Sequence, residues 1–230
     1  MSNSFLINAQ LRKQNYDPLT SFEAVCYLVK SPQLILVNSG SPYRTLANLV
    51  DDAREKPGRL TLGSIGPAST QHIAFELLRR TAKIDMTFVP YTAASPVVNA
   101  LLGDHIVSAF ADYATTGEQI RAGKLRALAT ASRSRIDSLS DVPTVAESGY
   151  PDFEVEVWYG LVVPSKTPKN AISQLAGWFA IALQAPEVRG KLKALGLSPV
   201  GQCGAEFADH IRNKYQEYGR IIREGNIKGE

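Results

Sequence analysis

The chain has 230 residues, of which 44% are hydrophobic and 20% are charged. This composition is typical of a globular protein with a buried core, and the length suits two modest α/β lobes, because domains usually hold roughly 100 to 200 residues. The 25 basic and 22 acidic residues give a net charge of +3, and the basic residues are spread over several segments, so no nucleic-acid partner is predicted.

The sequence as written shows no targeting or metal-binding signal. No run approaches the roughly 18 apolar residues of a membrane helix, and Met1 to Ser4 does not begin a signal peptide, so we expect a soluble chain without an export signal. Cys26 and Cys203 make neither a disulfide framework nor a metal cluster, and we interpret them as small buried side chains. The three histidines lack the spacing of metal ligands, so neither a metal nor a cofactor is predicted.

Strand and helix patterns alternate along most of the chain, which favours βα units and largely parallel sheets. Apolar strand residues fill 22–37, with a break at 30–32, and a helix is predicted over 45–56 behind Thr45 as its cap. A strand at 59–62 then runs into a glycine-containing turn and a second helix. Further strands are predicted at 86–89, 106–110 and 125–130. One helix is predicted with Ser95 as its cap, Pro96 as its first residue and Gly103 as its stop, and another over 116–122.

The segment from Phe153 to Val163 changes its burial pattern partway along. Apolar and acidic residues alternate first, and a continuous apolar run ends the segment. Such a strand is expected where a chain crosses from one lobe into another, although an edge strand that ends in the core of a single domain fits the same pattern. Beyond it we predict a helix over 171–183 that is buried on most sides, a helix from Pro186 that ends just before Gly196, and a long amphipathic helix over 207–222.

The turn from Gly63 to Thr70 is the best candidate for a binding site. Glycines after a strand let the backbone approach a ligand, and Ser69 or Thr70 opens a helix whose free N–H groups attract anions. The turn is neither a Walker loop nor a Gly-x-Gly-x-x-Gly fingerprint. An ordinary capped turn explains it equally well.

Two further loops are expected at the same edge of the sheet. Tyr91 to Ala94 and Ala111-Asp112 each follow a predicted strand, and ligands of open α/β sheets bind at the carboxyl ends of the strands. Small polar residues also suit ordinary turns. The basic residues at 121, 124, 126, 133 and 135 are interpreted as a solvated face.

A hydrolytic alternative would use Ser64 as nucleophile, His72 as base and either Asp85 or Asp112 to orient the base. The sequence around Ser64 lacks the Gly-x-Ser-x-Gly elbow that exposes a hydrolase serine. We therefore do not predict an enzyme.

With these loops identified, the sequence resembles the Bug, or TctC-like, receptors of tripartite tricarboxylate transporters, and the resemblance covers essentially the whole chain. The matching segments are Tyr16-Asp17-Pro18, Gly63-Ser64-x-Gly66 with Ser69 and His72, Val89-Pro90-Tyr91, Ala122–Ala129, Asp141–Gly149 and Trp158-Tyr159-Gly160. Several long motifs in the right order are more specific than any short pattern within them.

The resemblance implies an α/β, type II periplasmic-binding-protein (Venus flytrap) fold with two lobes and a small di- or tricarboxylate, or a related acid, as ligand. It implies lobe 1 at 1–37 and 160–230, and lobe 2 at 38–159. It also implies a periplasmic location and membrane transporter subunits as partners. The ligand-binding residues carried over from the family are Ser64, Gly66, Ser69, Thr70, Tyr91, Thr92, Ala93 and, as the weaker transfer, Asp112.

The chain also departs from the family pattern. Ala68 replaces a frequent glycine, and Thr92-Ala93 replaces a common Lys-Gly pair, so a different ligand shape is expected. Family members begin with an export signal and a first βα unit that carries a Gly-Gly-x-x-Asp loop, so we expect an incomplete first lobe here and a possible homodimer through its exposed sheet edge. A ligand-sensing module for a signalling partner and an inactive truncated fragment stay open as alternatives.

Overall fold

The computed structural model describes residues 1–66 and 69–228. The chain divides into two compact units, each described by itself below. Unit 1 comprises Met1–Ser31 and Val157–Glu230, and unit 2 comprises Pro32–Glu156. Unit 2 is therefore one continuous stretch of chain, entered at residues 31/32 and left at 156/157.

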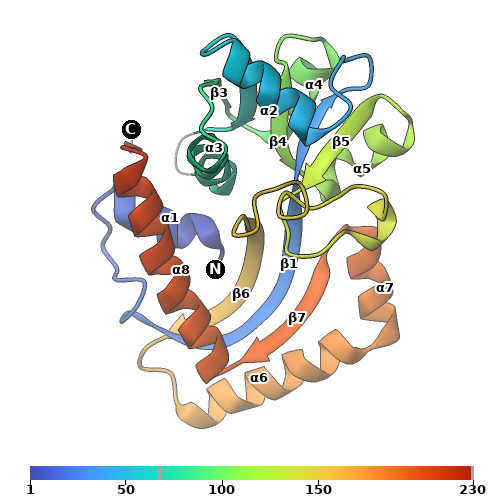
Figure 1. The fold of residues 1–230 in the computed structure, drawn as a ribbon. Coiled ribbons are helices and arrows are strands. Elements are labelled where there is room, and N and C mark those ends of the chain that lie inside the picture. Colours follow the sequence, from blue (N-terminus) through green and yellow to red (C-terminus); the bar gives the residue numbers. More distant parts are fainter. Residues whose placement is uncertain (67–68, 229–230) are drawn as a thin grey trace. The chain divides into compact units, whose positions relative to one another are not determined.

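Strand β1 (Phe22–Asn38) is the element that both units share, and Figure 1 draws it as one long blue strand. The predicted break at 30–32 is wrong, because β1 continues through these residues. Its partners change at this point, since β7 (Ser198–Cys203) pairs as far as Lys30 and β4 (Ser108–Asp112) pairs from Gln33 onward. Pro32, which has no N–H to donate to a neighbouring strand, lies in the gap between them.

In unit 2 the strands follow the order β3-β2-β4-β1-β5, with β2 at Thr61–Ile65, β3 at Thr87–Tyr91 and β5 at Leu125–Thr130. Strand β2 is parallel to β3 and to β4, whereas β1 is antiparallel to β4 and to β5. The sheet is thus mixed rather than largely parallel. Strands and helices alternate as predicted from β1 to β5, but β1 runs in the opposite direction to β4 and β5.

Two apolar clusters cover the two faces of this sheet. Along β1, Ile35 and Val37 belong to one cluster, and Leu34 and Leu36 belong to the other. All four side chains are fully buried, as expected where successive residues of a central strand point to opposite faces. The first cluster includes helices α2 (Leu46–Glu55) and α3 (Thr70–Thr81), and the second includes α4 (Ala94–Leu102) and Tyr113, the first residue of α5 (Tyr113–Arg121).

Of the two predicted helix caps, one is confirmed and the other is wrong. Thr45 caps α2 as predicted, in a reciprocal capping box with Asn48. Helix α4 begins at Ala94 with Ala93 as its cap, so the prediction that Ser95 caps it is wrong. Pro96 still lies in the first turn, where its missing N–H costs no intrahelical bond.

Unit 1 contains α1 (Asn3–Leu11), β6 (Glu156–Pro164), α6 (Lys169–Gln184), α7 (Pro186–Ala194), β7 and α8 (Ala205–Glu224). Strands β6 and β7 both pair with β1. Neither α1 nor β7 was predicted. The core of the unit holds Trp158, which is 1% exposed and packs edge-on against Phe207.

Helix α6 contradicts the prediction that it is buried on most sides. Only Leu183 is buried, while Trp178 is 58% exposed and Ile181 is 73% exposed. Within unit 1 the helix packs on β7 and α7. Helix α6 therefore presents more apolar surface than these two neighbours cover.

The two cysteines are also corrected by the structure. Cys26 of β1 and Cys203 of β7 lie directly opposite each other in the antiparallel pair and form a disulfide. The disulfide was not predicted because the two cysteines are 177 residues apart in sequence and are brought together by β7, a strand that was not predicted either.

Candidate functional site

A small pocket in unit 2 lies where two strands end and the helices that follow them begin. Its lining side chains fill it, so that no space for a water molecule is left inside it. It is lined by Ile65 at the end of β2, Gln71 in the first turn of α3, Ala94 and Val97 in the first turn of α4, and Phe110, Ala111 and Asp112 at the end of β4. Asp112 is also the cap of α5, so three helix N-termini converge on this pocket.

These helix starts carry unused hydrogen-bonding capacity, because the first N–H groups of a helix have no partner within the helix. The N-cap side chain of α3, Ser69, accepts a bond from the backbone N–H of His72, at 3.1 Å. Helix α4 has Ala93 as its cap, which supplies no side-chain acceptor. The partial positive charge at each start favours an anion.

The two predicted serines of the first loop are occupied by local bonds, and the predicted threonine is buried. Ser64 is fully buried, and its Oγ donates to the carbonyl of Ile65 at 2.9 Å. Ser69 Oγ donates to the same carbonyl at 2.7 Å. Thr70 is 3% exposed. In this structure these residues shape the turn, and none of the three lines the pocket.

The second predicted loop is tied to the first through the backbone. The N–H of Gly66 donates to the carbonyl of Tyr91 at 2.8 Å, and a Cβ at Gly66 would come within 3.4 Å of that oxygen. Thr92 and Ala93 are exposed at the start of α4. The structure thus brings the two loops together. Of the eight ligand-binding residues carried over from the family, only Asp112 lines the pocket, together with Ala94 and Ala111 of the predicted loops.

Sequence reasoning missed the polar pair Gln33 and Gln71. Nε2 of Gln71 donates to Oε1 of Gln33 at 2.9 Å, and the two residues are 6% and 0% exposed, respectively. Gln33 Nε2 has no hydrogen-bond partner within the described residues. The signal that could have found this pair is a glutamine inside the apolar run of β1, because a buried amide needs a partner.

The hydrolytic alternative gains no geometric support. Ser64 Oγ is engaged with a backbone carbonyl, and His72 Nδ1 has no hydrogen-bond partner within residues 1–66 and 69–228, so no described acid orients it. The His72 ring instead stacks on Phe88, with the ring centroids 4.3 Å apart. Burial lowers the pKa of His72, which keeps the ring neutral and apolar in character.

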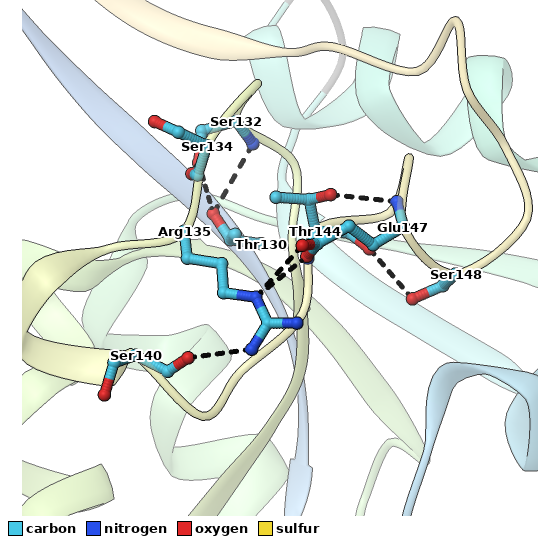
Figure 2. A network of polar contacts seen from close by, with 8 residues as sticks. All are labelled: Thr130, Ser132, Ser134, Arg135, Ser140, Thr144, Glu147 and Ser148. Carbon is cyan, nitrogen blue, oxygen red and sulfur yellow. Dashed lines mark hydrogen bonds and ion pairs between the residues drawn. The ribbon is translucent and has the colours of Figure 1, made fainter.

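A second polar network follows β5 (Figure 2). The guanidinium of Arg135 bonds both carboxylate oxygens of Glu147, at 3.1 and 3.0 Å, and the carbonyl of Ser140, at 2.9 Å. Glu147 in turn accepts from the backbone N–H of Thr144 at 2.7 Å. That bond, together with Arg135, holds the pKa of Glu147 below its usual value.

The interpretation of the basic residues as a solvated face holds for the exposed residues Arg121, Lys124, Arg133 and Arg135, whereas Arg126 is half-buried. Arg135 is engaged as described, and Arg126 donates to the backbone carbonyls of Ser39, Ser41 and Tyr43. Arginine forks of this kind hold loops in place. The matched motif from Asp141 to Gly149 is therefore built around structural hydrogen bonds.

Two searches of the described residues, 1–66 and 69–228, were negative. No group of three histidine, cysteine, aspartate or glutamate residues there is arranged to hold a metal ion. Nor is any helix in that part of the chain both long and apolar enough to span a bilayer.

Comparison with known proteins gives a family match along nearly the whole chain. The model of the tripartite tricarboxylate transporter family receptor, TctC, matches residues 1–227. A protein encoded in the tcbD-tcbE intergenic region of Pseudomonas sp. (strain P51) is 31% identical over 91% of this chain and 62% of its own length. A protein from a ttuE-ttuC' intergenic region of Agrobacterium vitis is 32% identical over 91% of this chain and 61% of its own length.

The chain thus spans about three fifths of the length of these first curated relatives. Among solved structures, a periplasmic transporter is 31% identical with a TM-score of 0.88, covering 99% of this chain and 77% of that one. Rhodopseudomonas palustris Rpa4515, solved with adipate, is 26% identical with a TM-score of 0.88, covering 99% and 77%. MatC from the same organism, solved with bound malate, is 25% identical with a TM-score of 0.81, covering 96% and 77%.

The α/β fold of the periplasmic binding proteins, predicted through the resemblance, is confirmed by these matches. The predicted family is confirmed as well, since its model covers far more than half of the residues. The chain belongs to the TctC, or tripartite tricarboxylate transporter receptor, family.

Proposed function

We propose that this chain captures a small carboxylate for uptake and does not change it chemically. The observation that carries the proposal is that the starts of α3, α4 and α5 lie together at one edge of the sheet of unit 2. Two structurally similar proteins were solved with carboxylates, Rpa4515 with adipate and MatC with malate. Both lie at about a quarter sequence identity to this chain.

Binding would rest on backbone groups rather than on basic side chains. Each helix start supplies the equivalent of about half a positive charge, and its N–H groups point outward along the helix axis. A ligand carboxylate at the exposed start of α4, beside Thr92 and Ala93, would accept hydrogen bonds from the first backbone N–H groups of this helix. No cap side chain accepts from these groups. The predicted residues Ser64, Gly66, Ser69, Thr70 and Tyr91 would support this site by holding the neighbouring loop.

The wider role follows from the family. We take unit 2 as lobe 2 of the receptor and unit 1 as belonging to lobe 1. The ligand-loaded protein would act in the periplasm and deliver its cargo to the membrane subunits of a tripartite tricarboxylate transporter. Family members and structural neighbours are solute-binding proteins, and the engaged Ser64 hydroxyl is consistent with binding without catalysis.

Isothermal titration of the folded chain with malate, adipate, succinate and citrate tests the proposal. We expect saturable heat with at least one acid. Ala94→Asp places a negative charge at the start of α4 and should weaken binding at least about tenfold through like-charge repulsion. The matched control is Ala171→Asp in the first turn of α6 of unit 1, which should leave the affinity unchanged.

Two outcomes would count against a carboxylate receptor. One is the absence of binding heat with every acid for a sample whose circular dichroism shows it to be folded. The other is an equal affinity of the wild-type chain and the Ala94→Asp variant for the same acid.

A further inference from the structure

Highly exposed large hydrophobic side chains are a feature of unit 1. Among the described residues they are Leu19, Tyr159, Trp178, Ile181 and Leu195, and all five belong to the stretches of chain that form this unit. Three of them lie on consecutive helices, Trp178 and Ile181 on α6 and Leu195 directly after α7. These two helices, drawn in orange in Figure 1, pack on each other, and we call their solvent-exposed side the α6–α7 surface.

Helix α6 turns an uncharged side to the solvent. Its residues from Asn170 to Gln184 include no acidic or basic side chain. Trp178 and Ile181 are three residues apart, so they project from the same side of the helix, while the buried Leu183 lies on the other side. An exposed helix side normally carries charged or polar residues, so a tryptophan and an isoleucine there indicate a surface that contacts a partner.

The same two helices concentrate the positive charge of the chain. Residues 166–195 hold five basic residues and one acidic residue, which gives a charge of +4. The remaining 20 basic and 21 acidic residues of the chain give −1. All five basic residues are exposed: Lys166, Lys169, Arg189, Lys191 and Lys193. A partner of this surface is therefore expected to be negatively charged.

Basic groups lie at both ends of α6. Lys169 is its first residue. At the other end, Nε of Arg189 donates to the carbonyl of Leu183 at 3.1 Å, and Nη2 donates to Oε1 of Gln184 at 3.4 Å, so this guanidinium lies at the last turn of α6. The 16 residues of α6 span roughly 24 Å. Two cations thus bracket an uncharged stretch that carries Trp178.

We propose that the α6–α7 surface binds an anionic membrane surface, with α6 lying in the plane of the lipid headgroups. Tryptophan suits this position, because its ring is apolar and its N–H can reach a polar group. Lysines and arginines near an anionic bilayer each strengthen binding roughly fivefold. A second copy of the chain fits less well, because it would bring two surfaces of charge +4 together. The inference does not depend on the carboxylate site of unit 2.

Binding of the full chain to lipid vesicles tests the proposal. The chain has two tryptophans, and Trp158 is only 1% exposed, so a change in tryptophan fluorescence reports on Trp178. Vesicles of equal parts phosphatidylglycerol and phosphatidylcholine should shift the emission to shorter wavelength. The chain should bind them at least about tenfold more tightly than vesicles of phosphatidylcholine alone. High salt should weaken this binding, because it screens the charges.

Charge variants test the electrostatic part of this contact. Lys169→Gln with Lys191→Gln removes one cation from each helix and should weaken binding to the anionic vesicles at least about tenfold. The matched control is Arg59→Gln with Lys124→Gln, which removes the same charge from exposed positions of unit 2. This control should change the affinity by less than about twofold, because its residues lie outside the α6–α7 surface.

Apolar variants test the contact of α6 itself. Trp178→Ala with Ile181→Ala should weaken binding at least about tenfold, because less apolar surface enters the headgroup region. Both side chains are exposed, so circular dichroism should show an unchanged fold. Leu19→Ala is the control, since it removes an exposed apolar side chain outside α6 and α7 and should leave the affinity within about twofold of the wild-type value.

Equal binding to both kinds of vesicle, or no binding of the folded chain to either, would overturn the inference. Wild-type affinity in the charge variant or in the apolar variant would overturn it as well. Binding of polyglutamate without binding of anionic vesicles would reject the membrane contact and assign the surface to an acidic protein. An emission shift that appears without lipid and grows with protein concentration, together with a dimer in size-exclusion chromatography, would reject it in favour of a second copy.

Discussion

Nε2 of Gln71 donates a 2.9 Å hydrogen bond to Oε1 of Gln33 in the interior of unit 2, which leaves the Nε2 group of Gln33 without a partner among the described residues. Removing one member of such a pair leaves the other amide unsatisfied, whereas removing both can be nearly neutral. Gln71→Met alone should therefore cost about 1 to 3 kcal/mol of unfolding free energy, and Gln33→Met with Gln71→Met should cost less than the single change. Urea unfolding of the two variants measures the difference. A double variant that loses the sum of both single effects would contradict this account.

In unit 1, Asn3 links two distant elements. Its Nδ2 donates to the hydroxyl of Tyr218 at 2.6 Å, and its Oδ1 accepts from the backbone N–H of Trp158 at 2.7 Å. Asn3 is fully buried, so Asn3→Ala should lower the unfolding free energy by about 2 to 3 kcal/mol, because two buried polar groups lose a partner. Asn8→Ala removes an exposed side-chain bond on the same helix and should change stability by less than about 0.5 kcal/mol. Similar losses in the two variants would show that the Asn3 bonds contribute little.

Glu147 should make the protein sensitive to acid. The pKa of Glu147 is lowered in the folded state by the backbone N–H of Thr144 and by Arg135. A depressed carboxylate pKa stabilises the fold above the unfolded-state pKa, about 4.3, and this stabilisation is lost as the pH falls through the lower, folded-state pKa. The urea concentration at the unfolding midpoint should therefore decrease as the pH is lowered below about 4.3. The difference between the midpoints of the wild-type chain and Glu147→Gln should become smaller over the same pH range.

The control for this pH series is Glu187→Gln, which removes a carboxylate from an exposed ion pair with Lys191. Its urea midpoint should follow the wild-type curve at every pH. A Glu147→Gln variant whose difference from wild type is the same at pH 7 and pH 3 would rule out the proposed linkage.

The disulfide between Cys26 and Cys203 should stabilise the oxidised chain. It closes a loop with a sequence separation of 177 residues, for which the chain-entropy estimate is about 5 kcal/mol, and measured values are commonly about 2 to 5 kcal/mol. Replacing both cysteines by alanine should lower the thermal midpoint measured without reductant. Adding reductant should lower the midpoint of the wild-type chain and leave that of the variant unchanged. Two reactive thiols in the folded, air-oxidised protein would contradict the pairing.

The sequence predicted the local elements of unit 2 best, and the reason is physical. Helix α2 combines apolar spacing with a capping threonine, so its limits were predicted to within about a residue at each end. Strand β7 was missed because Gly201 and Pro199 interrupt its apolar pattern and its stability comes from pairing with β1. The disulfide was missed with it, since local pattern cannot place two distant strands opposite each other.

The candidate site was predicted in part. The helix-start loops were identified, and Asp112 does line the pocket. Gln71 and Gln33 were not, because the glutamine inside the apolar run of β1 signals that it needs a partner without saying which one, and the contact joins residues 38 positions apart. Exposure of α6 was misjudged for a related reason, since an apolar helix is buried only where a neighbour covers it.

Ala131 holds both ends of unit 2 at once. Its N–H donates to the carbonyl of Gln33, the second residue of the unit, at 2.8 Å, and its carbonyl accepts from the N–H of Val155, the next-to-last residue, also at 2.8 Å. The chain therefore enters and leaves unit 2 at neighbouring points, as it does in an inserted domain. A gene fragment for 32–156 is a natural unit for transplantation, and its two ends lie near enough for a short engineered bridge to close them into a circle.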